Sequence, residues 1–241
     1  MQQHEAVIKT MEEHGGYATL GFLNQSVDVS SWKTKTPFAT IRRIVQNDRF
    51  FFKIRPGLWA LKSYKDKLPE NVFTAEKIPE IKQEEFNHSY YQGLLVEIGN
   101  LKKQETFVPY QDKNKKYLEK SLSEITTIEK FYDFTHKNLL RQAITIDVSW
   151  FNKRKMPSYF FEIEHSTGIK NSLSKFVELQ DFYTKFYIVA DIAKKREYED
   201  KKSLSIFSPI QDRVNFIDYE SLSNWHTKSF EVSKLENNFN F

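Results

Sequence analysis

The stretch PSYFFEIEHS, residues 157–166, has the pattern of a buried strand that carries two acids. Aromatic and β-branched residues fill it, and alternation along a strand sends Glu162 and Glu164 to one face and their apolar neighbours to the other. Two carboxylates on one buried face repel each other, so either a cation offsets this repulsion or the pair is kept for a function. This stretch therefore predicts a central strand of a sheet and a candidate site.

A third acid is expected on the preceding strand. In AITIDVSWF, residues 143–151, Asp147 alternates with apolar neighbours, and the short basic turn NKRKMP favours an antiparallel pair with the next strand. The three carboxylates would then converge on one surface, where a divalent cation is the natural compensation. Oxygen ligands without cysteine or paired histidines suit Mg²⁺, with Mn²⁺ as a substitute.

The elements around these strands predict an α/β core with a mixed sheet. Helical periodicity marks residues 84–104 and 171–184, and strands are expected at residues 105–112 and 185–192. A further helix is expected near residues 125–140. We place this domain at residues 83–241, after a Lys-, Glu- and Pro-rich linker at residues 64–82.

The first domain, residues 1–63, has the element order of a winged helix. Apolar periodicity predicts helices at residues 4–16, 17–27 and 36–48, and RFFFKIRPGLWALK, residues 49–62, predicts a hairpin. These features resemble winged helix-turn-helix domains, in which the third helix enters the major groove and the wing touches the backbone. The alternative is a domain that binds only protein. The resemblance implies candidate DNA contacts at Lys33, Lys35, Thr40, Arg42, Arg43 and Lys53.

In the second domain the sequence resembles the PD-(D/E)xK nuclease superfamily, to which most restriction endonucleases belong. Its pattern is an acid on the second strand and (D/E)-x-K on the third, matched here by Asp147 and then Glu162-Ile163-Glu164. Glu164 stands at the usual lysine position, as in E-x-E variants. The resemblance implies that Asp147, Glu162 and the Ile163 carbonyl hold Mg²⁺, and that Glu164 orients or deprotonates water.

The same resemblance implies further site residues. Many members carry a glutamate on the first helix that faces the metal, which corresponds to Glu97 here. Lys170 and Lys175 are candidates to touch phosphate or to replace the missing lysine, and solvated side chains are the alternative for both. Basic residues of the turn between the two strands are candidate DNA contacts, namely Lys153, Arg154 and Lys155.

Composition sets the remaining limits. The 241 residues contain no cysteine, which excludes a disulfide framework and thiolate metal sites. No apolar signal core or membrane-length apolar run is present, so a soluble, cytoplasmic protein is expected. The formal net charge of +4 permits a polyanionic partner without requiring one.

Three functions fit these patterns. The first is a Mg²⁺-dependent endonuclease of restriction type that cuts double-stranded DNA, with the winged helix reading sequence or base modification. The second is a DNA-binding regulator whose nuclease-like domain is inactive and serves for dimerisation, which the missing lysine favours. An RNA or single-strand nuclease is the third. Because duplex cleavage needs two active sites, a homodimer is expected at least during cutting.

Overall fold

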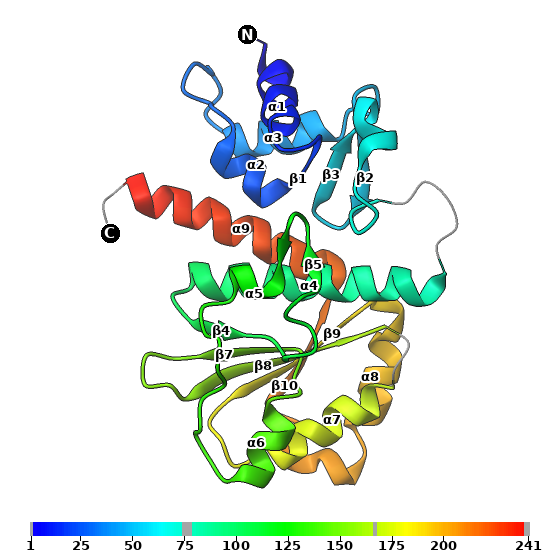
Figure 1. The fold of residues 1–241 in the computed structure, drawn as a ribbon, viewed down its shortest axis with the longest axis vertical. Coiled ribbons are helices and arrows are strands. Elements are labelled where there is room, and N and C mark those ends of the chain that lie inside the picture. The colour runs from blue at the N-terminus through cyan, green and yellow to red at the C-terminus, as the bar shows by residue number, and fades with distance from the viewer. Residues whose placement is uncertain (1, 74–78, 166–167, 239–241) are drawn as a thin grey trace. The chain divides into compact units, whose positions relative to one another are not determined.

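The computed structural model describes residues 2–73, 79–165 and 168–238 (Figure 1). Residue 1, residues 74–78 of the expected linker, residues 166–167 and residues 239–241 lie outside the described residues. The chain divides into two compact units, one formed by Met1–Pro79 with Ser223–Phe241 and the other by Glu80–Leu222. No helix within the described ranges is both long enough and apolar enough to cross a membrane.

The first unit contains helices and a three-stranded antiparallel sheet of order β1-β3-β2. Its elements up to the linker are α1 (Gln3–Glu12), β1 (Tyr17–Thr19), α2 (Leu20–Ser26), α3 (Pro37–Val45), β2 (Phe51–Arg55), β3 (Leu58–Leu61) and the 3-10 helix η1 (Lys62–Lys67). Apolar side chains from all three helices and the hairpin form its core, including Val7, Leu23, Ile41 and Phe51.

The helix expected at residues 17–27 begins later, because its first three residues form strand β1. Gly15 and Gly16 have φ angles of 73° and 85°, which glycine adopts without steric cost and which turn the chain from α1 into the sheet. Tyr17 then lies opposite Ala60 of β3. The hydroxyl of Thr19 accepts a hydrogen bond from the Phe22 N–H at 3.2 Å and thereby caps α2.

The C-terminal segment from Ser223 packs into this first unit. The Asn24 side-chain amide donates to Glu231 Oε1 at 3.1 Å, and Glu231 is only 8% exposed. The Lys234 ammonium donates to the Asn24 carbonyl at 2.8 Å. Gly21 leaves room for this segment, since a Cβ there would lie 2.8 Å from the Phe230 ring. Residues far apart in the sequence therefore belong to one compact unit.

The second unit contains a five-stranded mixed sheet of order β10-β9-β8-β7-β4. Strands β8, β9 and β10 are parallel, whereas β7 is antiparallel to both β8 and β4, which confirms the expected mixed sheet. The elements that build the sheet and its two main helices are α4 (Glu80–Leu101), β4 (Glu105–Phe107), β7 (Val148–Phe151), β8 (Pro157–Glu164), α7 (Ile169–Glu178), β9 (Lys185–Ala190) and β10 (Val214–Asp218).

Helices α4 and α7 cover opposite faces of this sheet (Figure 1). On the α7 face, Phe160 and Phe186 pack with Leu173 and Phe176 in the main core of the unit. The other elements are β5 (Lys116–Tyr117), β6 (Lys120–Ser121), α5 (Leu122–Ile125), α6 (Lys137–Ala143), η2 (Ile192–Lys194), α8 (Lys195–Lys202), η3 (Ser205–Ile210) and α9 (Tyr219–Asn238), which continues into the first unit.

Two expected elements are wrong in extent. The helix expected near residues 125–140 is interrupted: α5 ends at Ile125 and α6 begins only at Lys137, because the N–H groups of Thr127 and Ile128 bond to the Thr106 carbonyl and the intervening segment runs beside β4 as irregular chain. Its apolar side chains still pack in the core, so their spacing resembled that of a helix although the backbone there is irregular. The strand expected from residue 143 starts only at Val148, because α6 extends to Ala143.

Candidate active site

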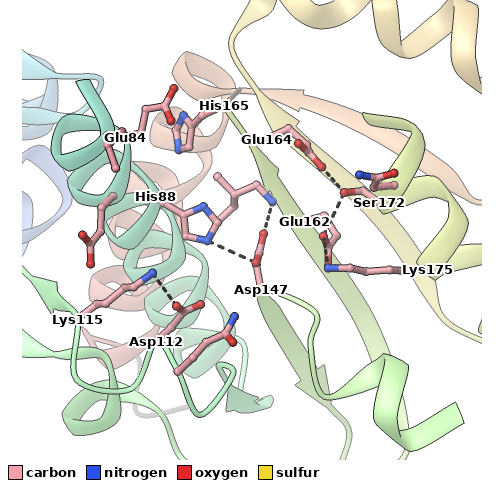
Figure 2. A pocket seen from close by; sticks show the side chains of 15 residues that line it. Glu84, His88, Asp112, Lys115, Asp147, Glu162, Glu164, His165, Ser172 and Lys175 are labelled. Carbon is pink, nitrogen blue, oxygen red and sulfur yellow. Dashed lines mark hydrogen bonds and ion pairs between the residues drawn. The ribbon is translucent and has the colours of Figure 1, made fainter. Parts of the chain in front are cut away.

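A pocket of about 450 Å³ opens in the second unit where β7 begins and β8 ends (Figure 2). Side chains of α4 and of the segment before β5 line one side, and side chains of α7 line the other. The lining residues used below are His88, Asp112, Lys115, Asp147, Glu162, Ile163, Glu164, His165, Ser172 and Lys175.

The two glutamates of β8 lie on one face, as alternation predicts. Glu162 and Glu164 are each 4% exposed, and the Ser172 hydroxyl on α7 contacts both carboxylates, with Glu162 Oε2 at 3.1 Å. A hydroxyl has one proton to donate, so it can satisfy only one of the two carboxylates at a time. The second contact requires a proton on a glutamate or a cation nearby.

Asp147 precedes β7 and is fixed by β8. The Ile163 N–H donates to Asp147 Oδ2 at 2.7 Å, and His88 Nε2 lies 3.4 Å from Asp147 Oδ1 (Figure 2). Burial lowers the pKa of His88, but the charge of Asp147 and its hydrogen bond raise it more, so the net pKa is raised. Asp147 is thus held between the end of the sheet and helix α4.

Lys175 supplies a positive charge from α7. Its Nζ lies 2.8 Å from Glu162 Oε2 and 2.9 Å from Oε1. Burial raises the pKa of Glu162 to about 8, and the charge of Asp147 adds to this rise against the opposing effect of Lys175. Burial lowers the pKa of Lys175, but the charge and hydrogen bond of Glu162, together with the neighbouring acids, raise it more, so the net pKa is raised. A protonated Glu162 would no longer raise the pKa of Lys175. For this pair the raised pKa of Glu162, which burial causes, is therefore the shift that matters.

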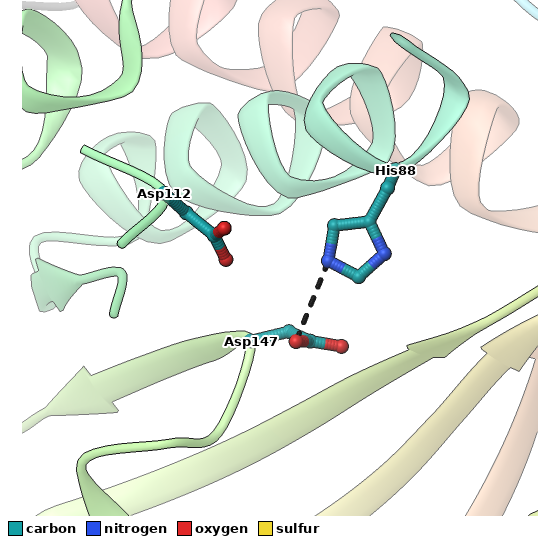
Figure 3. A group of neighbouring side chains, drawn as sticks. All are labelled: His88, Asp112 and Asp147. Carbon is teal, nitrogen blue, oxygen red and sulfur yellow. Dashed lines mark ion pairs between the residues drawn. The ribbon is translucent and has the colours of Figure 1, made fainter. Parts of the chain in front are cut away.

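His88 and Asp112, like Ser172 on the opposite side of the pocket, are site residues that the sequence patterns did not indicate. Ligand atoms of His88, Asp112 and Asp147 all lie within 4.8 Å of one another (Figure 3). Asp112 is 2% exposed and pairs with Lys115 at 2.7 Å. The spacing of Glu84 and His88, one turn apart on an expected helix, is the signal that could have marked His88. Nothing local marks Asp112.

Glu97 is not brought to this pocket. Its carboxylate accepts a hydrogen bond from the Tyr117 hydroxyl at 2.7 Å. Nine residues separate it from His88, which corresponds to about 13 Å along the axis and about half a turn around it. The polar face of α4 that reaches the site is therefore the His88 face, and Glu97 lies on the other side of the helix.

The expected DNA contacts of the second unit lie at two ends of the sheet. Lys153, Arg154 and Lys155 are exposed in the turn between β7 and β8, at the ends of those strands opposite to the acids. Lys170 is exposed on α7 and does not line the pocket, whereas Lys175 on the same helix does. Of these basic residues, only Lys175 touches the carboxylates.

The expected DNA contacts of the first unit are mostly exposed. Lys33, Lys35, Arg43 and Lys53 are exposed and Arg42 is half-buried. Thr40 is 8% exposed, and its hydroxyl donates to the Thr36 carbonyl at 3.1 Å, so the helix itself occupies that group.

Comparison with known proteins assigns the family. The family described as the type II restriction enzyme NmeDI C-terminal domain matches residues 67–239, well over half of the chain. No curated protein and no solved structure matches the chain. The match covers α4, the five-stranded sheet and the acidic pocket. This chain therefore belongs to the family of the type II restriction enzyme NmeDI C-terminal domain and is a restriction endonuclease-like protein.

Proposed function

We propose that this protein is a Mg²⁺-dependent type II restriction endonuclease of the PD-(D/E)xK kind, which hydrolyses phosphodiester bonds in double-stranded DNA. The observation that carries the proposal is the convergence of Asp147, Glu162 and Glu164 in one pocket with Lys175. The mutual repulsion of three carboxylates there is unfavourable unless a cation binds between them. Family membership supports the same reaction class.

The donor set fits Mg²⁺. Asp147 and Glu162 supply hard oxygen ligands, and burial together with the charge of Asp147 raises the pKa of Glu162, an effect that a bound cation would oppose. The Ile163 N–H points to Asp147, and in a strand the carbonyl of the same residue points to the same side. Asp147, Glu162 and the Ile163 carbonyl would hold the ion, which when bound would lower the pKa of water and neutralise charge on the phosphate.

Glu164 and Lys175 together take the roles that a single lysine on this strand has elsewhere in the superfamily. Glu164 lies on the same strand face as Glu162, where its carboxylate can orient the attacking water and accept its proton. Lys175 brings an ammonium group to this face from α7. The positive charge missing from β8 is thus supplied by the facing helix, which weakens the case for an inactive site.

We assign DNA binding to the first unit as a winged helix. Helices α1 to α3 followed by the β2–β3 hairpin have the expected element order, and α3 carries Arg42 and Arg43 in its last turn. Lys53 is exposed on β2, in the hairpin that would form the wing. In this role the unit contributes sequence or modification recognition, and phosphate contacts make its binding salt-dependent.

Cleavage of both strands requires two pockets, so we propose a homodimer at least during cutting. Sedimentation of the protein with and without a DNA duplex tests this. Two chains per duplex are expected, and one chain per duplex during complete double-strand cleavage contradicts it.

The function is tested with mixed methylated and unmethylated plasmid DNA and Mg²⁺. The wild type should cut at least one substrate, and Asp147→Ala should lower the rate by about 100-fold or more, since several kcal/mol of stabilisation depend on the held cation. Asp133→Ala, which removes an exposed aspartate outside the pocket, is the matched control and should cut normally.

Three results would contradict the proposal. Tight binding to DNA with every substrate left intact would establish the regulator with an inactive nuclease-like domain. Cleavage that survives Asp147→Ala would show that the reaction uses other residues. Cleavage confined to RNA or single strands would show that double-stranded DNA is not the substrate.

A further inference from the structure

Three side chains with metal-ligating atoms lie close together on the α4 side of the pocket. One carboxylate oxygen each of Asp112 and Asp147 and a ring nitrogen of His88 lie within 4.8 Å of one another (Figure 3). Asp112 is almost fully buried, and its neighbouring cation is Lys115, whose side chain is 29% exposed. Two acids and an imidazole therefore lie beside one partly exposed ammonium group, that of Lys115.

Gln92 adds a buried acceptor to this cluster. Its Nε2 donates to Asp112 Oδ2 at 2.9 Å and to the Asp147 carbonyl at 3.0 Å, so the amide lies between the two aspartates. Gln92 is 0% exposed, and its Oε1 has no hydrogen-bond partner among the described residues. A buried amide oxygen without a partner is unfavourable, and this oxygen belongs to the same amide that contacts both aspartates.

His165 adds a second unsatisfied acceptor in the same pocket. The Tyr219 hydroxyl contacts the Glu164 carbonyl at 3.1 Å and His165 Nδ1 at 2.7 Å. A carbonyl cannot donate, so Tyr219 donates to it and accepts from an Nδ1–H group of His165. The lone pair then resides on His165 Nε2, which is shielded from solvent and has no partner in the described part of the chain. The His165 and His88 rings lie 5.8 Å apart.

We infer that His88, Asp112 and Asp147 form a binding site for a divalent transition-metal cation, separate from the Mg²⁺ position proposed between Asp147 and Glu162 but sharing Asp147. An imidazole nitrogen beside two carboxylates favours Mn²⁺, Co²⁺ or Zn²⁺ over Mg²⁺, which prefers oxygen ligands alone. In the metal-free protein the Lys115 ammonium, paired with Asp112, supplies positive charge beside these ligands. The inference rests on the proposed function only for the role of the ion in cleavage, not for its binding.

Mn²⁺ binding in the absence of DNA tests this inference. Electron paramagnetic resonance measures free Mn²⁺ during a titration, and spin-echo modulation by ¹⁴N detects a coordinated imidazole. The Glu162→Gln background removes a ligand of the proposed Mg²⁺ position and so isolates the second one. His88→Ala is compared with His136→Ala, which removes an exposed histidine of the same unit outside the pocket.

The expected result is one nitrogen-coordinated Mn²⁺ per chain. His88→Ala should weaken binding by about tenfold or more and abolish the nitrogen modulation, whereas His136→Ala should leave both unchanged. Lys115→Met should tighten binding, because it removes the competing ammonium, and this gain should vanish when Asp112→Asn is added. Loss of the gain in that double variant identifies Asp112 as a ligand.

Bound Mn²⁺ without nitrogen modulation in the chain with all its histidines overturns the inference, and this reading requires no histidine variant to fold. An unchanged affinity in His88→Ala overturns it as well. Mg²⁺-dependent cleavage is scored separately. Cleavage without a nitrogen-coordinated ion refutes this inference alone, and a nitrogen-coordinated ion without cleavage of any substrate refutes the proposed function alone.

Discussion

Glu162→Gln should make the metal-free protein more stable, with a gain that grows as the pH rises. Glu162 is 4% exposed, and burial raises its pKa to about 8 from an ordinary value of 4.5. Between these two values the unfolded chain has lost the proton that the folded chain keeps. The folded state thus binds more protons, and the free energy of unfolding falls as the pH rises. Glutamine resembles the protonated acid and avoids this loss.

The pKa shift gives the magnitude. Each pH unit between about 4.5 and 8 costs the wild type about 1.4 kcal/mol, because one proton separates the two states. The penalty is absent below pH 4.5 and is complete above pH 8. The stability difference between Glu162→Gln and the wild type should therefore increase by about 3 kcal/mol from pH 5.5 to pH 7.5. Any contact with Lys175 that glutamine weakens shifts this difference by a constant.

Urea unfolding in EDTA at several pH values measures this difference. Glu178→Gln is the control, because Glu178 lies on the exposed side of the same helix as Lys175 and its variant should show no pH-dependent gain. A difference between Glu162→Gln and the wild type that stays flat across this range, or that falls as the pH rises, would show that burial does not hold the proton on Glu162.

Three further predictions follow from the packing. Lys175→Met should lower Mg²⁺-dependent cleavage on every cleaved substrate, measured by initial rates, and Lys175→Arg should restore part of it. Gly93→Ala should destabilise the second unit by about 1–3 kcal/mol in urea unfolding, because its Cβ would lie 2.0 Å from the Tyr117 ring. Deletion of the chain after Leu222 should weaken DNA binding more than it alters the five-stranded sheet, since the deleted helix completes the first unit; gel shifts and circular dichroism measure the two effects.

The sheet around the acids could be predicted from local pattern. Period-2 alternation in β8 and an apolar helix in α7 mark elements whose type depends on their own residues. The short turn between β7 and β8 then requires antiparallel pairing, which the structure has. The adjacency of Glu162 and Glu164 on one face follows from the same geometry.

The α4 side of the pocket could not be predicted in this way. Asp112 lies 35 positions before Asp147, in an irregular segment with no periodicity, and only the folded chain brings it to His88. Glu97 is the opposite case: it is expected in the pocket and lies on the expected helix, but its side chain contacts Tyr117. Long-range pairing and helix rotation depend on the packing of the whole unit, which one sequence does not encode in any short window.

Helix α9 has a consequence for the order of folding during synthesis. The contacts of Asn24 with Glu231 and Lys234 cannot form until more than two hundred residues have been translated, although α1 to α3 leave the ribosome first. The second unit, by contrast, has its whole sheet available once β10 is made. A chain interrupted between β10 and the end of α9 would hold an intact acidic pocket while the unit to which we assign DNA recognition is still incomplete. In a cell that makes a restriction enzyme, nascent chains of that kind would lack the means to find their target.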